Sequence, residues 1–199
     1  MAYHQDEFEV IREFADLGPS CGYVCQFLDS KWGPSRTQAA LTAGLLGVLW
    51  SPSEVAVDPR WLLRKIPEFL SDRYGVRFRF GTAVHSIKLP KIEAGMETWT
   101  ADTVIVCAGD NFETLYPETF TGSGISRCKL PMMRTAPQPG GWRLGPTLAG
   151  GLTLRFAPSF NLCPSLPILK ERIARELPEY DQWGIHVMVT QTSDGELPP

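Results

Sequence analysis

The residues from Ala101 to Gly109, written ADTVIVCAG, constrain the fold of this chain more than any other stretch. Val104 to Cys107 form a continuous apolar run, which is typical of a strand covered on both faces in a parallel sheet. The run ends at Ala108-Gly109, where small residues let a ligand or another backbone come close. Ligands of open α/β sheets bind outside the carboxyl ends of the strands. The ending therefore predicts either a ligand contact or simply a tight strand-to-helix turn.

A helix is predicted upstream of this strand. Asp58 suits the N-cap position, Pro59 suits the first helical position, and Gly75 ends the helix. Pro67 falls inside and predicts a kink. Five apolar residues follow at helical spacing and predict a buried face: Leu62, Leu63, Ile66, Phe69 and Leu70.

Two extended segments separate this helix from the apolar strand. The alternation in VRFRF (76–80) predicts a strand with one apolar and one charged face. TAVHSIKL (82–89) predicts a second strand, and a polar turn is expected around 91–95. Helix, strands and buried strand together resemble the end of a doubly wound α/β domain.

The remaining segments favour helices and antiparallel strands. A helix is predicted from Asp6 to Leu17, with Gly18-Pro19 as its stop. After Gly109, three strands are expected, within 128–138, 148–158 and 184–193. A helix over 165–177 is expected to direct Ile168, Leu169, Ile173 and Leu177 inward. The predicted fold class is α/β with α+β: a partial doubly wound domain plus a mostly antiparallel sheet with flanking helices.

The composition excludes several classes of protein. The apolar share is 43%, the charged share is 21% and the net charge is -3, which disfavours disorder and nucleic-acid binding. The apolar run Ala39–Trp50 is shorter than the roughly 20 residues of a membrane-spanning helix. The N-terminus lacks a secretory pattern, so a cytoplasmic location is predicted. The five cysteines are expected to be free thiols, without zinc: Cys21, Cys25, Cys107, Cys128 and Cys163.

A family resemblance is carried by DPRWLLRKIPEFLSDRYGVRFRFGTAVHSIK followed by ADTVIVCAGDNFETLYP. These runs resemble the D-amino-acid-oxidase-like FAD-dependent oxidoreductases, which include glycine and sarcosine oxidases. In that family a helix, a strand ending in T-x-V and a strand ending in A/C-x-G occur in this order. The blocks CKLPMMRTAPQP, GGLTLRF and WGIHVMVTQTSDGEL look like one subgroup, often associated with aminophosphonate catabolism.

The resemblance implies contacts with FAD. Val84, at the end of Thr82-Ala83-Val84, is expected to contact the adenine end of FAD through its backbone. Cys107, Ala108 and Gly109 are expected to lie near the pyrophosphate and ribityl region. For Val84 the alternative is a plain core residue, because β-branched residues fill such strands anyway.

Two parts of the family's flavin site are missing from the sequence. No G-x-G-x-x-G loop occurs between a strand and a helix, although that loop holds the cofactor pyrophosphate. The sequence also stops at DGELPP, where the second glycine-rich segment of the family would begin. The chain is therefore expected to be an internal portion of a longer enzyme or a copy that has lost both ends. Weak or absent FAD binding is predicted for the chain alone.

The substrate site departs from the family as well. Amino-acid-oxidising relatives carry a Pro-Arg pair before a DG turn, where the Arg grips the substrate carboxylate. Here Gln191-Thr192 occupy that place, which argues against a simple α-amino acid. Three cations either bind an anionic group of the substrate, such as a phosphonate, or are ordinary surface charges: Lys129, Arg134 and Arg155. His186 lies on a predicted strand of the substrate domain and is a fourth candidate for substrate binding.

The function predicted is FAD-dependent oxidation of a C–N bond of a small amine. The domains expected are a substrate-domain part at 1–57, a partial FAD domain at 58–117 and a substrate-binding domain at 118–199. No catalytic residue is assigned, and no metal, nucleic acid or membrane partner is expected. The chain is expected to associate with itself through the surface that the missing segments leave exposed. Two alternatives remain open: a non-catalytic remnant or interaction module, and a flavoprotein reductase with two dinucleotide domains.

Overall fold

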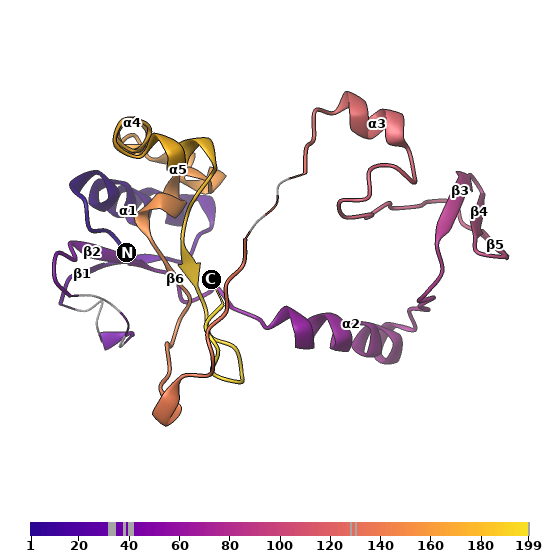
Figure 1. Cartoon of the computed structure of the whole chain (residues 1–199), viewed down its shortest axis with the longest axis horizontal. Helices are drawn as coiled ribbons and strands as arrows, with labels where there is room; N and C mark the ends of the chain where they lie inside the picture. Colours follow the sequence, from indigo (N-terminus) through magenta and orange to yellow (C-terminus); the bar gives the residue numbers. More distant parts are fainter. Residues whose placement is uncertain (32–34, 38, 40–41, 128, 130, 199) are drawn as a thin grey trace. The chain divides into compact units, whose positions relative to one another are not determined.

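The computed structural model describes residues 1–31, 35–37, 39, 42–127, 129 and 131–198. The chain combines helices with small antiparallel sheets, as in the general α/β and α+β classes (Figure 1). It divides into two compact units: unit 1 comprises Met1–Pro59 and Met132–Pro199, and unit 2 comprises Arg60–Pro131. The assignment of 1–57, 58–117 and 118–199 to substrate and cofactor domains stays a prediction.

Unit 1 has a hydrophobic core between two helices that the sequence predicts. Helix α1 (Gln5–Leu17) buries Val10, Ile11 and Phe14. Helix α4 (Leu166–Glu176) packs against it and buries Leu166, Leu169 and Ile173. Leu177 is half-buried against the same core, whereas Ile168 is 62% exposed. The prediction that Ile168 faces inward is therefore wrong, because the buried stripe of α4 follows residues 166, 169 and 173.

Short strands and 3-10 helices complete unit 1. Strand β1 (Gln26–Asp29) pairs antiparallel with β2 (Gly47–Trp50), and β6 (Leu148–Ala149) pairs antiparallel with β7 (Met188–Val189). The other elements are η1 (Gly18–Cys21), η3 (Pro139–Gly141), η4 (Gly151–Arg155), η5 (Pro158–Leu162) and α5 (Pro178–Gln182). The three long strands expected after Gly109 are thus reduced to β6 and β7 within the described residues. In place of strand, residues 151–155 form a helical turn, and 131–138 form neither helix nor strand.

A partly buried charge network joins the two core helices. Arg172 Nε donates to Asp6 at 2.6 Å, and Nη2 donates to Glu7 at 3.3 Å. The Glu7 carboxylate also accepts the backbone N–H of Tyr3 at 2.9 Å and of His4 at 3.2 Å. A Cβ at Gly151 would collide with this carboxylate, so only glycine fits there.

Unit 2 contains two helices and one three-stranded sheet. Helix α2 (Pro59–Tyr74) has the predicted bounds and continues through Pro67. Gly75 follows it with φ of 67°. Strands β3 (Val84–Lys88), β4 (Lys91–Ala94) and β5 (Glu97–Thr100) form the antiparallel order β3-β4-β5, and α3 spans Pro117–Gly122. No residue of α2 is buried, so the face predicted for burial is open to solvent within the described structure.

Three predictions for unit 2 are wrong. Residues 104–107 form no strand, because no described strand forms hydrogen bonds with them. Ile105 is 83% exposed, so this segment is not covered on both faces. The VRFRF segment also forms no strand; Phe78 stacks on Phe80, and Arg77 and Arg79 lie over Trp99. Residues 91–94, expected as a turn, form β4, because Ile92 and Ala94 alternate toward the interior of the sheet.

No helix in the described ranges is long and apolar enough to cross a membrane.

Candidate functional site

Three of the residues predicted to contact the flavin, at positions 107–109, lie in an open turn. Cys107, Ala108 and Gly109 are exposed and belong to no helix or strand. Gly109 has φ of 61°, which favours glycine, and no protein atom lies within 4 Å of where its Cβ would stand. The turn closes by a hydrogen bond of 3.1 Å from the Asn111 N–H to the Ala108 carbonyl oxygen. The backbone here is accessible to a ligand.

Arg127 holds the loop that follows this turn. Its Nε and Nη2 donate to the Asp110 carbonyl oxygen at 2.9 and 2.6 Å, and Nη2 also donates to the Glu113 carboxylate at 2.7 Å. The guanidinium lies 4.9 Å from the centre of the Phe112 ring. The hydrogen bond from Arg127 lowers the pKa of Glu113, and the same bond raises the pKa of Arg127. No role for Arg127 was predicted from the sequence. The available signal was its positive charge, which is opposite to the charges of Asp110 and Glu113.

Val84 belongs to a different part of unit 2. It opens β3, pairs with Ala94 of β4 and is half-buried. No hydrogen bond in the described part of the chain joins it to Cys107, Ala108 or Gly109. Its half-buried place in the sheet also suits the alternative of an ordinary structural valine.

Two of the predicted substrate-binding residues, Arg155 and His186, each contact the ring of Phe156. The Arg155 guanidinium lies 4.3 Å from the centre of the Phe156 ring. The His186 ring centre is 5.0 Å from that of Phe156, and its Nδ1 is 3.1 Å from the Gly184 carbonyl oxygen. Both residues therefore border the same aromatic side chain, although they are 31 positions apart in the sequence.

Most donors of Arg155 are already used. Its side chain is 3% exposed and pairs with Asp181 at 3.3 Å. Its terminal nitrogens donate to the carbonyl oxygens of Leu152, Tyr180 and Ile185 at 3.0, 2.8 and 3.0 Å. Nε is the atom that faces the Asp181 carboxylate at 3.3 Å, and it is buried without a hydrogen bond to any described residue. Burial lowers the pKa of Arg155, against the opposing effect of Asp181. The side chain therefore ties η4 to α5, and none of its nitrogens is open to a ligand in this conformation.

A shallow hollow of about 340 Å³ adjoins this cluster. Its lining combines two cations, two carboxylates and an aromatic ring: Arg155, Phe156, Lys170, Glu171, Ala174 and Asp181. Positive and negative side chains are balanced there, so the hollow has no strong preference for a multiply charged anion.

The other two predicted substrate-binding cations, Arg134 and Lys129, have no described contact with Arg155, Phe156 or His186. Arg134 Nη1 pairs with Glu196 at 3.5 Å, and Lys129 is exposed in unit 2. Gln191 stands in the segment where the sequence resemblance predicts a Pro-Arg pair with a carboxylate-binding Arg. It accepts the Leu144 N–H at 2.8 Å and donates to the carbonyl oxygens of Trp142 and Gly195 at 3.1 and 3.3 Å. This position joins two loops of unit 1.

Four of the five cysteines lie among the described residues. Among the described residues Cys21, Cys25, Cys107 and Cys163 are free, and Cys128 lies outside them. Burial, together with the nearby charge of Glu13, raises the pKa of Cys163 to about 11. In the part of the chain with described coordinates, no group of three His, Cys, Asp or Glu residues is arranged to hold a metal ion.

The exposed turn at 107–109 fits one requirement of a flavin site, namely a backbone that no side chain covers. A Cβ at Gly109 would project into open space. Arg127, the cation described beside this turn, is already paired with Asp110 and Glu113.

Comparisons of the chain with known protein families, with curated proteins and with solved structures find no match.

Proposed function

We propose that this chain takes part in FAD-dependent oxidation of a C–N bond of a small amine. The proposal rests on the sequence resemblance described above, and the structural observation that carries it is the open glycine turn at 108–109. Cys107, Ala108 and Gly109 are assigned to the cofactor, and Val84 to its adenine end. A turn whose glycine has no neighbour within 4 Å supports this assignment because a planar ligand can reach its amides.

The chemistry divides between cofactor and protein. FAD, when bound, accepts the hydride that leaves the substrate carbon. The residues of this chain bind and orient: the backbone of 107–109 approaches the cofactor, and Arg127 fixes the conformation of the adjoining loop through Asp110 and Glu113. No side chain is assigned as a proton donor or acceptor.

An amine carrying an anionic group, such as an aminophosphonate, is the proposed substrate class. Arg155 and His186 support it because both border Phe156. Lys129 and Arg134 stay candidates for the anionic group.

Titration of the chain with FAD, followed by flavin fluorescence and calorimetry, tests the proposal. We expect saturable binding weaker than about 10 μM, because the sequence contains no phosphate-binding glycine loop. Gly109→Val is expected to weaken binding at least about fivefold by filling the approach to the turn. Gly124→Val is the matched control, since Gly124 has a similar φ of 71° and equally open surroundings. Equal effects of the two substitutions would contradict the assignment of Gly109.

An interaction module without flavin is the second candidate. The observation that favours it is α2, whose apolar residues Leu62, Leu63, Ile66 and Phe69 are all exposed. Such a module would show no FAD binding up to about 1 mM and would associate with itself or another protein through apolar surface. Sedimentation of the chain with and without FAD separates the two functions.

A further inference from the structure

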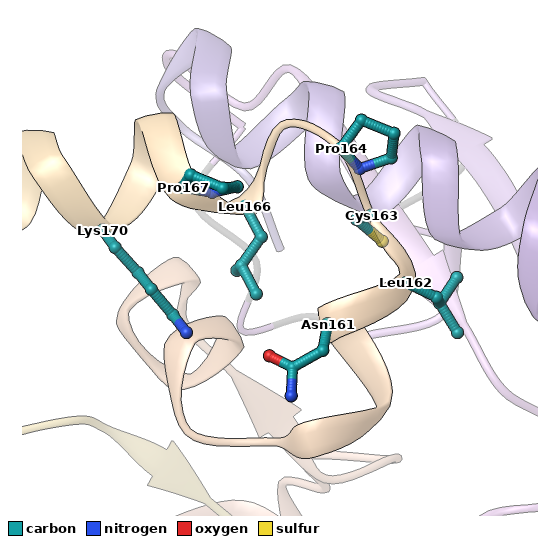
Figure 2. Close-up of a pocket in the computed structure, with 7 residues that line it drawn as sticks. All are labelled: Asn161, Leu162, Cys163, Pro164, Leu166, Pro167 and Lys170. Carbon is teal, nitrogen blue, oxygen red and sulfur yellow. The ribbon is translucent and has the colours of Figure 1, made fainter.

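A second hollow lies at the start of α4 in unit 1, and neither proposed function uses it. Its volume is about 330 Å³, within the range of small-ligand pockets. Figure 2 shows its lining, which comes from the end of η5, the connection 163–165 and the first turns of α4: Asn161, Leu162, Cys163, Pro164, Leu166, Pro167 and Lys170.

The lining separates an apolar floor from a polar opening. Cys163 and Leu166 are buried beneath the hollow, and Pro164 and Pro167 are exposed at its rim. The side chains of Lys170 and Asn161 extend toward the same hollow, with Leu166 between them (Figure 2). A ligand with a short apolar chain and a polar head would match this arrangement.

Lys170 makes the polar opening attractive to an anion. Its ammonium group forms no ion pair or hydrogen bond with any residue that the structure describes, and the side-chain amide of Asn161 forms none either. An ammonium group without a partner beside an amide N–H₂ offers donors to a carboxylate. Nearby acids limit the charge of the ligand, because Lys170 also lines the neighbouring hollow together with Glu171 and Asp181. A monoanion is therefore favoured over a dianion.

We propose that this hollow binds a small amphiphilic monoanion, a short-chain monocarboxylate, with its carboxylate at Lys170 and Asn161 and its chain over Leu166. The proposal goes beyond the flavin function and does not depend on it.

Hexanoate is the probe, and amide NMR shifts of residues 161–174 are the measurement. For a ligand of this size the expected dissociation constant is about 1 mM. Hexanol, which has the same chain without the charge, is expected to bind at least about fivefold more weakly, and hexylamine more weakly still. Hexanol binding as tightly as hexanoate, or shifts that do not saturate by about 20 mM hexanoate, would overturn the proposal.

Substitutions locate the carboxylate. Lys170→Gln is expected to weaken hexanoate binding about fivefold, and Lys170→Glu more strongly. The matched control is Arg175→Gln, which removes a cation from the same helix outside the hollow; it is expected to change affinity less than about twofold. Lys170 and Arg175 are both exposed, so these variants keep the core intact. Equal losses for Lys170→Gln and Arg175→Gln would show a general charge effect and refute the site.

Discussion

Helices α1 and α2 are both amphipathic, yet their apolar faces have different surroundings. In unit 1, α1 buries Val10, Ile11 and Phe14 against α4 and the segments around it. In unit 2, α2 buries no residue, and the described core of that unit consists of Ile92 and Ala94 in β4. Helical periodicity in a sequence thus identifies an apolar face, but it does not establish that another element covers that face.

The largest difference expected between the two helices is in hydrogen exchange. Amides of α1 should be protected by the core of unit 1, whereas an uncovered helix of 16 residues is only marginally stable in water. We expect protection in α1 to exceed that in α2 by about 10³-fold, which corresponds to roughly 4 kcal/mol. Exchange measured by NMR or mass spectrometry tests this. Equal protection would show that something covers α2 in solution.

The next largest effect concerns the core of unit 1. Ile173→Ala removes a fully buried side chain from α4 and should lower the free energy of unfolding by about 2–5 kcal/mol. Ile66→Ala in α2 should change it by less than about 0.5 kcal/mol. Ile168→Ala is the control on the same helix as Ile173, because Ile168 is exposed. Urea denaturation followed by circular dichroism measures all three.

A smaller effect is expected at the contact between η4 and α1. Gly151→Ala would press a methyl group into the Glu7 carboxylate and should destabilise unit 1 by about 1–3 kcal/mol. Gly150→Ala is the matched control, since the nearest atom to its Cβ would be 3.8 Å away. Similar melting temperatures for the two variants would contradict the packing of Glu7 against Gly151.

The smallest effect is a pH dependence from Cys163. Its folded pKa of about 11 lies above the ordinary value of 9.0, because burial disfavours the thiolate. This contribution to stability is therefore complete below pH 9.0 and is lost as the pH rises toward 11. Cys163→Ala should flatten the alkaline part of the stability profile of unit 1, whereas Cys107→Ala should leave it unchanged, since Cys107 is exposed.

The sequence predicted the elements that depend on neighbouring residues better than the elements that depend on distant ones. The bounds of α1, α2 and α4 are close to the predicted ones because caps, proline and glycine act locally. Residues 76–80 and 104–107 carry strand patterns but form no strand, since a ladder needs a partner that composition does not specify. Strand β4 was detectable from the alternation of Ile92 and Ala94 with Lys91 and Glu93, although the strand has only 4 residues.

The candidate sites were predicted less well than the helices. A turn at Gly109 was expected from two small residues, but as the end of a buried strand that residues 104–107 do not form. Arg127, which fixes the adjoining loop, is 17 positions from Asp110 and carries no motif. The pairing of Arg155 and His186 around Phe156 depends on tertiary packing, as does the hollow at Lys170. Such contacts join segments that no local pattern relates.

Unit 1 is assembled from both ends of the chain, with residues 60–131 inserted between its two parts. On a ribosome that adds about 5–20 residues per second, α1 would emerge roughly 10 s or more before α4 is complete. During that interval the apolar stripe of the first helix can meet β1 and β2 but not α4, so part of this stripe stays open to chaperones until α4 has been made.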